Sequence, residues 1–258
     1  MPDLLQDHSL KDRVVVVTGG ARRLGRAIAL ECARRGASVA ITFLSSQSEA
    51  RETVEEMRAV GGESQRFEAY ELEVSDLAQV HKLVRDVETD MGGASDLVNN
   101  ASIFRRTPWH SLSEDDFDAH INANLRGPFL LCKYFEPQLS TSKAPGGGCI
   151  VNMGDIYGQR PLKNYAPYCA SKAGLLMLTQ VLALSLAPHV RVNAVCPGTI
   201  LLPSTVQGEE DDLEALVPKI PLGRLGEPDD IARAVAFLLE SPFLSGVALP
   251  VDGAQRLK

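Results

Sequence analysis

The stretch that decides the fold is residues 14–25, which read VVVVTGGARRLG. Residues 14–18 form a continuous apolar, β-branched run, which is typical of a strand buried on both faces. A glycine-bearing turn follows, and the apolar spacing over 24–35 predicts a helix. Such a turn presents backbone N–H groups and the positive end of the helix to a phosphate. The segment therefore predicts either a nucleotide-binding α/β unit or, taken alone, a plain strand–helix turn.

The same alternation of strand and helix continues along the chain. Further strands are expected at 38–43, 67–73, 96–99, 149–153, 191–195 and 246–251. Helices are expected near 49–60, 77–91, 117–139, 168–186 and 229–239. Alternating elements of this kind predict βαβ units, hence an α/β fold with a parallel sheet covered by helices on both faces. Without a repeat or a linker, residues 1–258 are expected to form one dinucleotide-binding catalytic domain.

Composition excludes several classes of protein. The 26 Lys and Arg against 33 Asp and Glu give a net charge of −7, which argues against a nucleic-acid binder. Five scattered cysteines show neither zinc spacing nor a disulfide framework, so no metal site is expected. Residues 1–13 lack the apolar core of a secretory signal, and no membrane span is expected. The chain is expected to be cytoplasmic, with a flexible segment at 1–10.

One expected helix is unusual, because residues 170–187 read ASKAGLLMLTQVLALSLA. This stretch is apolar nearly all the way round, and a helix without a wet face must be buried on all sides. On a helix that coats a sheet, this pattern indicates a contact with another subunit. An ordinary central helix is an equally good interpretation of this feature.

The second strand carries a hint about the cofactor. An acid about 20 residues beyond the phosphate loop would bind the ribose 2′-hydroxyl of NAD(H). No acid lies there before Glu49, and Ser45 and Ser46 stand at the expected place, with Arg22 nearby in the loop. Hydroxyls and a guanidinium suit a 2′-phosphate, so NADP(H) is favoured over NAD(H). The alternative is a solvated arginine beside a loop of small residues.

A candidate catalytic group follows in the second half of the chain. Tyr168 and Lys172 are four residues apart and share one face of a helix. A nearby ammonium favours the phenolate, so Lys172 is expected to lower the pKa of Tyr168. Asp155 lies thirteen residues before Tyr168, just beyond a strand, at the edge where α/β sheets bind ligands.

Taken together, these motifs resemble the short-chain dehydrogenase/reductase family over nearly the whole chain. The segments that carry the resemblance are TGGARRLG at 18–25, NNAS at 99–102, Asn124, Asp155, YCASK at 168–172, RVNAVCPG at 191–198, PLGR at 221–224 and VDG at 251–253. The resemblance implies a Rossmann-type three-layer αβα sandwich with a seven-stranded parallel sheet. It also implies an enzyme that transfers a hydride to a small-molecule substrate, assembled as a homo-oligomer, with a tetramer favoured.

The resemblance also assigns residues to roles. Tyr168 would donate a proton, Lys172 would hold the nicotinamide ribose, and Asn124 would help to maintain a proton-relay water. With Asp155, these form the expected catalytic set. The expected cofactor-binding residues are Gly19, Arg22, Arg23, Leu24, Gly25, Ser45, Ser46, Glu73, Val74, Asn100, Ala101, Ser102, Tyr168, Lys172, Pro197, Gly198 and Ile200. Residues 203–218 are expected to form a lid over the substrate.

Three departures from the family pattern suggest a substrate. Arg23 replaces a glycine, Asp155 replaces a serine, and NNAS replaces NNAG ahead of Phe104. Together they are similar to the pteridine reductase branch. Phe104 could stack on a flat pterin, Ser102 and Arg23 could bind its polar atoms, and an Asp155–Tyr168 pair could relay a proton to nitrogen. Structural alternatives are a core-filling Phe104 and an Asp155 salt bridge.

These observations leave three functional hypotheses. The first is NADPH-dependent reduction of a pterin of the dihydropteridine, dihydrobiopterin, dihydrofolate or dihydromonapterin class. The second is reduction of a carbonyl compound or a 3-oxoacyl thioester by the same machinery. The third is a non-catalytic NADP(H)-binding regulatory subunit, against which Asn124, Tyr168 and Lys172 argue, because a sensor needs no proton relay.

Overall fold

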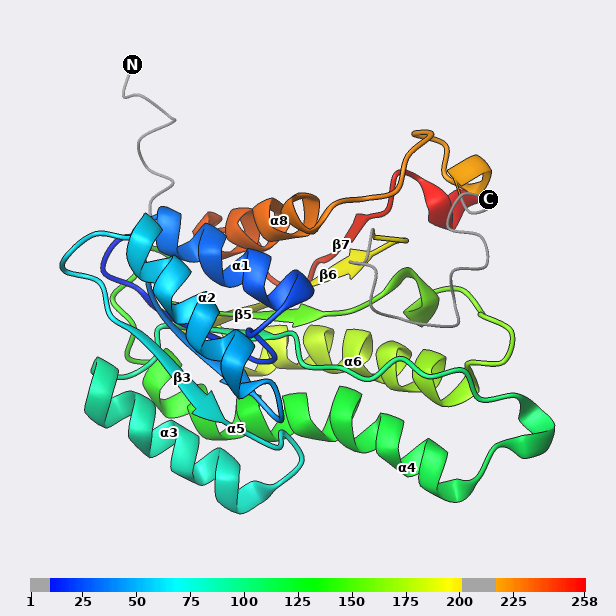
Figure 1. Cartoon of the computed structure of the whole chain (residues 1–258), viewed down its shortest axis with the longest axis horizontal. Helices are drawn as coiled ribbons and strands as arrows, with labels where there is room; N and C mark the ends of the chain where they lie inside the picture. Colours follow the sequence, from blue (N-terminus) through cyan, green and yellow to red (C-terminus); the bar gives the residue numbers. More distant parts are fainter. Residues whose placement is uncertain (1–9, 201–216) are drawn as a thin grey trace.

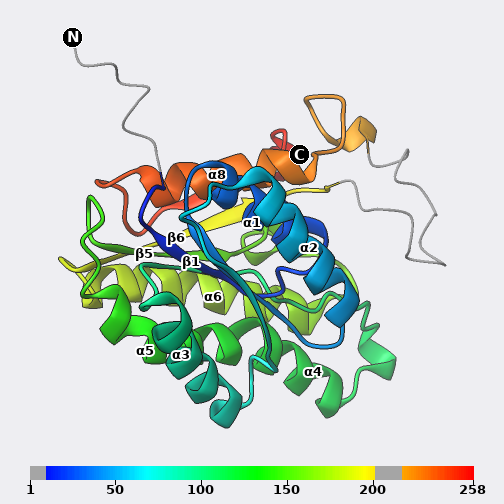
Figure 2. The ribbon, with the colours of Figure 1, turned by 60° about the vertical axis from the view of Figure 1, so that its left-hand side comes forward.

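The computed structural model describes residues 10–200 and 217–258. All but the last residue of the expected flexible segment 1–10, and all but the last two residues of the expected lid 203–218, lie outside the described residues. Figures 1 and 2 show a central sheet with helices on both faces. This is the three-layer arrangement expected from the alternation of strands and helices.

The sheet has seven strands in the order β3-β2-β1-β4-β5-β6-β7, all paired in parallel. Their bounds are β1 Val14–Val17, β2 Ser38–Phe43, β3 Phe67–Glu71, β4 Asp96–Asn99, β5 Gly148–Met153, β6 Val190–Pro197 and β7 Ala248–Val251. The expected Rossmann-type fold is therefore confirmed. The order reverses between β1 and β4, and ligands of such sheets bind at the carboxyl ends of the strands beside this switch point.

Helices cover the two faces in separate groups. Their bounds are α1 Arg23–Arg34, α2 Gln47–Val60, α3 Leu77–Met91, α4 Glu114–Ile121, α5 Gly127–Leu139, α6 Ala166–Ser185 and α8 Pro228–Glu240. Helices α1, α2 and α8 lie on one face, and α3, α5 and α6 lie on the other (Figures 1 and 2). Each face has its own buried core, one including Ile28 and Leu238, the other Leu83 and Phe135.

The single helix expected at 117–139 is divided in the structure. It begins at Glu114, because Ser113 forms a capping box in which its hydroxyl accepts from the Asp116 backbone while the Asp116 side chain accepts from the Ser113 backbone. A π-helical segment, Asn122–Arg126, then separates α4 from α5. Such segments are rare and are frequent at functional sites. It carries the one fully enclosed polar side chain of this segment, Asn124, which is 1% exposed.

Helix α6 keeps an uncovered apolar face. Among the described residues it alone is long and apolar enough to cross a membrane, by length and composition only, and buried core helices meet the same two criteria. Its other face packs on the sheet, where Leu175 and Thr179 are 1% exposed. Met177 is 60% and Leu184 is 84% exposed. The expected all-round burial is therefore not found among the described residues of a single chain.

Candidate active site

The loop after β1 is shaped to approach an anion closely. Gly19 adopts φ +63°, a conformation that favours glycine. A Cβ on Gly25 would lie 2.1 Å from the Gly19 carbonyl oxygen, so only hydrogen fits there. No side chain of the described residues caps the start of α1, and the first N–H groups of the helix face outward from its positive end. These features fit the diphosphate of a dinucleotide.

Hydrogen bonds tie this loop to both neighbouring strands. The Asn100 side chain donates to the carbonyl oxygens of Thr18 (2.8 Å) and Gly19 (3.1 Å), which joins the loop to the end of β4. The Thr18 hydroxyl accepts from the backbone N–H groups of Asn100 and Ala101, both at 2.9 Å. On the other side, the Gly20 N–H donates to the Thr42 carbonyl at 2.9 Å. The structure thus brings Gly19, Asn100 and Ala101 together, as expected.

The arginines of the loop differ in their surroundings. Arg22 is exposed at the first position before α1, and Ser45 and Ser46 follow β2, the strand to which the loop is bonded. Arg23 has φ +52°, so it holds the left-handed backbone that a glycine would adopt without strain. Its side chain lines a groove of about 610 Å³ with Arg26, Arg34 and Glu56, between α1 and α2. Within the described residues, no hydrogen bond or ion pair joins Arg23 to Ser102, Phe104 or Asp155.

Tyr168, Lys172 and Asp155 form one cluster at the carboxyl end of β5. The Tyr168 hydroxyl donates to Oδ2 of Asp155 at 2.6 Å. The other carboxylate oxygen accepts from the Tyr157 N–H at 2.8 Å, within the short 3₁₀ helix Ile156–Gly158. Nζ of Lys172 donates to the Met153 carbonyl at 2.7 Å and lies 5.7 Å from the centre of the Tyr168 ring. A proton donor, a carboxyl group and an ammonium therefore share one small volume.

Burial controls the ionisation of this cluster. It raises the pKa of Asp155 above its usual value, against the opposing hydrogen bond from Tyr168 and the charge of Lys172. It also lowers the pKa of Lys172 to about 8. The pKa of Tyr168 is well above its usual value because of burial first, then the charge of Asp155 and its hydrogen bond. The expectation that Lys172 lowers the tyrosine pKa is therefore wrong for the free enzyme, since burial and Asp155 dominate.

The side chain of Asn124 joins the loop after β4 to α6. Its side-chain oxygen accepts from the Ser102 hydroxyl (3.0 Å) and the Ile103 N–H (2.9 Å). Its amide donates to the Ile103 carbonyl (3.0 Å) and the Ser171 hydroxyl (3.1 Å). All four side-chain hydrogen-bonding positions are thus used within the protein. The hydroxyl of Ser102 is engaged in the same network.

Phe104 lies against the cluster, but its ring already has aromatic partners. It stacks on Tyr165 with centroids 4.5 Å apart and planes 12° apart. Its ring also meets that of Tyr168 edge-on at 4.7 Å. Phe104 remains 51% exposed, so it is no core-filling residue. The two aromatic rings of Phe104 and Tyr165 form a wall beside the Tyr168 hydroxyl.

The remaining expected cofactor residues lie around the edge of the sheet. The Glu73 carboxylate is turned back onto Ser75, accepting from its N–H and hydroxyl at 3.1 and 3.0 Å. Val74 is buried. Pro197 ends β6, and a Cβ on Gly198 would lie 2.8 Å from the Cα of Asp252. Leu24, by contrast, packs partly buried against the core.

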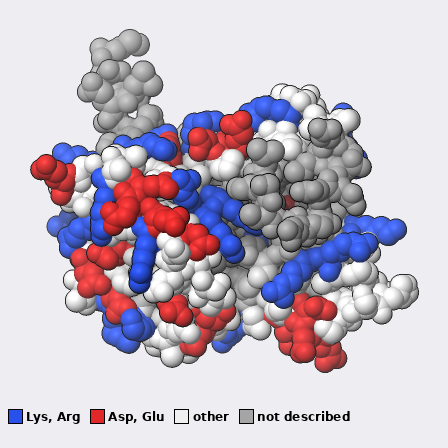
Figure 3. Space-filling model, viewed as in Figure 1, with Lys and Arg blue, Asp and Glu red and all other residues white. Residues whose placement is uncertain are grey.

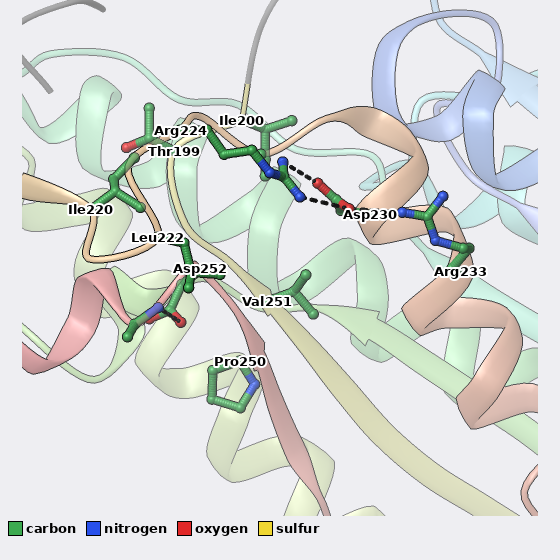
Figure 4. Close-up of a pocket in the computed structure, with 13 residues that line it drawn as sticks. Thr199, Ile200, Ile220, Leu222, Arg224, Asp230, Arg233, Pro250, Val251 and Asp252 are labelled. Carbon is green, nitrogen blue, oxygen red and sulfur yellow. Dashed lines mark hydrogen bonds and ion pairs between the residues drawn. The ribbon is translucent and has the colours of Figure 1, made fainter. Parts of the chain in front are cut away.

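A cavity of about 370 Å³ lies beyond the ends of β6 and β7. Ile200, Ile220 and Val251 contribute to its apolar lining (Figure 4). At its rim, Arg224 donates to Asp230 at 2.8 and 3.3 Å. Ile200 therefore belongs to the wall of this cavity as well as to the expected nicotinamide segment.

Sequence reasoning missed several contributors to the site. Thr18 holds the loop to β4, Ser171 joins Asn124 to the Tyr168 carbonyl, and Met153 positions Lys172 through its carbonyl. Tyr165, the partner of Phe104, could have been found, because its spacing of three residues from Tyr168 places both at the start of one helix. Contacts through backbone carbonyls, such as that of Met153 with Lys172, cannot be predicted from the sequence, because every residue carries a carbonyl group.

Comparison with known proteins places the chain among oxidoreductases. The family model described as enoyl-(acyl carrier protein) reductase matches residues 19–254. A 3-oxoacyl-[acyl-carrier-protein] reductase FabG of Staphylococcus epidermidis is 34% identical over 245 residues, 94% of this chain and 98% of that protein. The enzyme of the same name from Thermotoga maritima is 34% identical over 247 residues, covering 95% of this chain and 98% of the relative.

Solved structures agree. A putative short-chain alcohol dehydrogenase from Sinorhizobium meliloti 1021 has a TM-score of 0.89 and 29% identity, covering 97% of this chain and 99% of the other. A blue fluorescent protein from a metagenomic library, solved in complex with NADPH, has a TM-score of 0.85 and 34% identity, covering 95% and 98% of the two chains.

These comparisons correct the pterin expectation. The relatives named as 3-oxoacyl reductases cover almost the whole chain, and they favour the carbonyl and 3-oxoacyl alternative over pterin reduction. The geometry supplies a physical reason. The Ser102 hydroxyl is bonded to Asn124, and Arg23 lines a groove with Arg26, Arg34 and Glu56, so the two groups expected to bind the polar atoms of a pterin do not meet at the cluster. On its matching family model, relatives and neighbours, the chain belongs to the short-chain dehydrogenase/reductase family.

Proposed function

We propose that this protein is an NADPH-dependent reductase of carbonyl compounds, with 3-oxoacyl thioesters as its substrate class. The observation that carries the proposal is the cluster of Tyr168, Asp155 and Lys172 beside a loop shaped for a diphosphate. Names of relatives that cover almost the whole chain support the thioester class. The exposed wall of Phe104 and Tyr165 offers an apolar surface for the acyl part of such a substrate.

The proposed cofactor is NADP(H). The diphosphate would bind at Gly19, Leu24 and Gly25, where the uncapped start of α1 supplies N–H groups. Arg22 with Ser45 and Ser46 would bind the 2′-phosphate. The remaining proposed contacts are Arg23, Glu73, Val74, Asn100, Ala101, Ser102, Tyr168, Lys172, Pro197, Gly198 and Ile200. When bound, the reduced nicotinamide supplies a hydride to the carbonyl carbon.

In the proposed reaction, the Tyr168 hydroxyl transfers its proton to the carbonyl oxygen as the alcohol forms. The protonation state of Asp155 decides whether this proton is available. An ionised Asp155 accepts a hydrogen bond from the Tyr168 hydroxyl, with the two oxygens 2.6 Å apart, and this bond directs the hydroxyl proton away from the substrate. A protonated Asp155 donates instead, and can support Tyr168 or the substrate oxygen. Lys172, fixed by the Met153 carbonyl, retains N–H groups for the ribose, while Asn124 holds the adjoining loop in place.

The assembly and setting of the enzyme are part of the same proposal. We propose a single catalytic domain over 1–258, a cytoplasmic location and a homo-oligomer, with a tetramer favoured. The exposed side chains of Met177, Val181 and Leu184 on α6 support contact between subunits.

The test is a substrate panel monitored by NADPH oxidation, with an acetoacetyl thioester, a simple ketone, dihydropterin and quinonoid dihydropterin in parallel. We expect turnover of the thioester, with little or none of the pterins. Turnover of the pterins alone would overturn the proposal. Tight binding of NADPH with no turnover of any substrate would also overturn it, in favour of a regulatory subunit.

A further inference from the structure

Three exposed basic side chains lie on the two segments that meet beside the aromatic wall of the site. Arg105, Arg106 and Lys163 are exposed. Within residues 10–200 and 217–258, none of the three forms an ion pair within 4.0 Å. Other exposed arginines of those ranges do form ion pairs, for example Arg58 with Glu55. Arg105 also interacts electrostatically with Asp116 on α4. The three cations therefore form a basic surface beside the acidic start of α4, and we call them the mouth cations.

The two segments that carry the mouth cations, around Thr107 and Asn164, are held side by side by backbone pairing. The Thr107 N–H donates to the Asn164 carbonyl at 2.7 Å, and Thr107 forms a parallel bridge with Tyr165. Thr107 is only 4% exposed, so this pairing is anchored in the protein interior. Arg106 and Lys163 directly precede the paired residues. Figure 3 shows a band of basic side chains on the right-hand side of this face, over the loops that lead into α4 and α6.

The segments that carry the mouth cations also carry Phe104 and Tyr165, the aromatic residues beside the proposed catalytic cluster. Arg105 directly follows Phe104, whose ring contacts both Tyr165 and Tyr168. Only Asn164 separates Lys163 from Tyr165 in the sequence, and the ring of Tyr165 stacks on Phe104. If the carbonyl of a substrate lies at the Tyr168 hydroxyl, the rest of the substrate would extend along the rings of Phe104 and Tyr165 toward these cations.

We propose that Arg105, Arg106 and Lys163 bind the phosphate of a phosphopantetheine arm that carries the acyl thioester. This inference rests on the proposed function, since it concerns the carrier of the same substrate. Guanidinium groups form paired, charge-assisted hydrogen bonds with phosphate. The protein as a whole has a net charge of −7 and repels a polyanion, so productive approach needs a local basic surface at the site. Glu114 and Asp115 at the start of α4 bound this surface on one side.

Phosphopantetheine comes from two sources, coenzyme A and a carrier protein, and the experiment separates them. Steady-state kinetics would be measured with acetoacetyl-pantetheine, which has no phosphate, with acetoacetyl-coenzyme A and with an acetoacetyl carrier protein. The variant is Arg105→Glu/Arg106→Glu. Its matched control is Lys82→Glu/Arg85→Glu on α3, which changes the net charge by the same amount at exposed positions away from the site.

We expect kcat/KM of the mouth variant for the phosphorylated substrates to fall about tenfold or more at low salt, and the difference from wild type to shrink as salt rises. The kcat/KM of the mouth variant for acetoacetyl-pantetheine should stay within about twofold of wild type. The kcat/KM of the control variant should stay within about twofold of wild type for all three substrates. A larger loss with the carrier protein than with coenzyme A identifies an acidic protein surface as the partner, and equal losses identify the phosphate alone.

Two results would overturn the inference without touching the proposed function. One is an unchanged kcat/KM for all three thioesters in the mouth variant. The other is an equal loss in the Lys82→Glu/Arg85→Glu control, which would indicate a general effect of net charge. If wild-type enzyme reduces none of the thioesters, the proposed function itself fails. Turnover of acetoacetyl-pantetheine by the variant shows that it is folded, and the milder Arg105→Gln/Arg106→Gln variant repeats the test if it is not.

Discussion

The hydroxyl of Tyr168 donates a 2.6 Å hydrogen bond to Asp155, a residue that also accepts the N–H of Tyr157. A serine at position 155, usual in this family, would offer a hydroxyl at any pH. A carboxyl group offers one only when it is protonated. Because burial raises the pKa of Asp155, the protonated form persists to a higher pH than in an exposed carboxyl. The site therefore couples proton donation by Tyr168 to the ionisation of its neighbour.

Removal of the Tyr168 hydroxyl tests the proposed proton donor. We expect Tyr168→Phe to lower kcat by about 10²- to 10⁴-fold, the range for loss of a general acid. Since the ring and its contacts with Phe104 remain, the Kd for NADPH, measured by fluorescence titration, should change little. A Phe variant that retains wild-type kcat would identify Asp155 or water as the donor instead.

The pH profile tests the role of Asp155. In wild type, kcat should fall as pH rises through the raised pKa of Asp155, because the ionised carboxylate holds the Tyr168 proton. In Asp155→Ser this limb should vanish, and activity should persist until Lys172 loses its proton. The pKa of Lys172 is about 8 and is held up in part by the charge of Asp155, so the new limb should lie near or below pH 8.

The comparison enzyme for this profile is Asp155→Asn, which keeps the shape of the side chain and cannot ionise. It should lack the same limb as the serine variant. An identical falling limb in wild type and in both variants would show that another group controls the profile. Tyr168, the Tyr157 N–H, Lys172, Cys169 and Cys196 all interact with Asp155. Lys172, whose pKa is about 8, would then be the group to examine.

Much of the fold followed from local patterns. The strand at 38–43 and the helix at 77–91 were predicted to the residue, because a β-branched run and a regular apolar period give strong signals. The start of α4 was missed by three residues, since the capping box at Ser113 depends on side-chain hydrogen bonds rather than on apolar spacing. The π-helical turn at Asn124 has no periodic signal at all.

The sequence predicts that Asp155, Tyr168 and Lys172 lie together, but it does not predict the direction in which the pKa of Tyr168 shifts. Spacing brought Tyr168 and Lys172 together, and the strand-end position placed Asp155 beside them. The sequence pattern could not reveal how deeply the three groups are buried, and burial reverses the expected pKa shift of Tyr168. Nor could it show that Phe104 stacks on Tyr165, because that contact depends on how two separate loops meet.

A buried ion pair near the start of the sheet should be important for stability. Arg13, 4% exposed, donates to Asp96, 0% exposed, at 3.0 Å. Removing Arg13 leaves the buried Asp96 with only the Ser95 hydroxyl as donor among the described residues and the charge of Arg191 nearby. We therefore expect Arg13→Ala to lower the free energy of unfolding by about 3–5 kcal/mol. Urea denaturation measures this change. Arg58→Ala, which breaks the exposed pair with Glu55, should change it by less than about 1 kcal/mol.

The pH dependence of this loss provides a second check. Burial already raises the pKa of Asp96 in the folded protein, despite Arg13. Without Arg13 the folded-state pKa should rise further above the unfolded value. A group with a raised folded pKa stabilises below its unfolded pKa and loses that contribution as pH rises through the folded pKa. The deficit of Arg13→Ala should therefore shrink at acidic pH, and a deficit independent of pH would point to lost packing instead.

The last prediction concerns the choice of cofactor. Arg22 is exposed at the start of α1, and the loop that carries it is bonded to the end of β2, just before Ser45. If its guanidinium binds the 2′-phosphate, Arg22→Ala should raise the Kd for NADPH by about ten- to a hundredfold, the effect of one or two charge-assisted hydrogen bonds. The Kd for NADH should stay nearly unchanged, because NADH lacks that phosphate. Arg26→Ala is the matched control, since it removes the same charge from the same helix but its guanidinium is paired with Glu56. Equal losses for NADPH and NADH in Arg22→Ala would show that Arg22 acts on the diphosphate or the fold, and the preference for NADPH would then have to come from Ser45, Ser46 or Arg23.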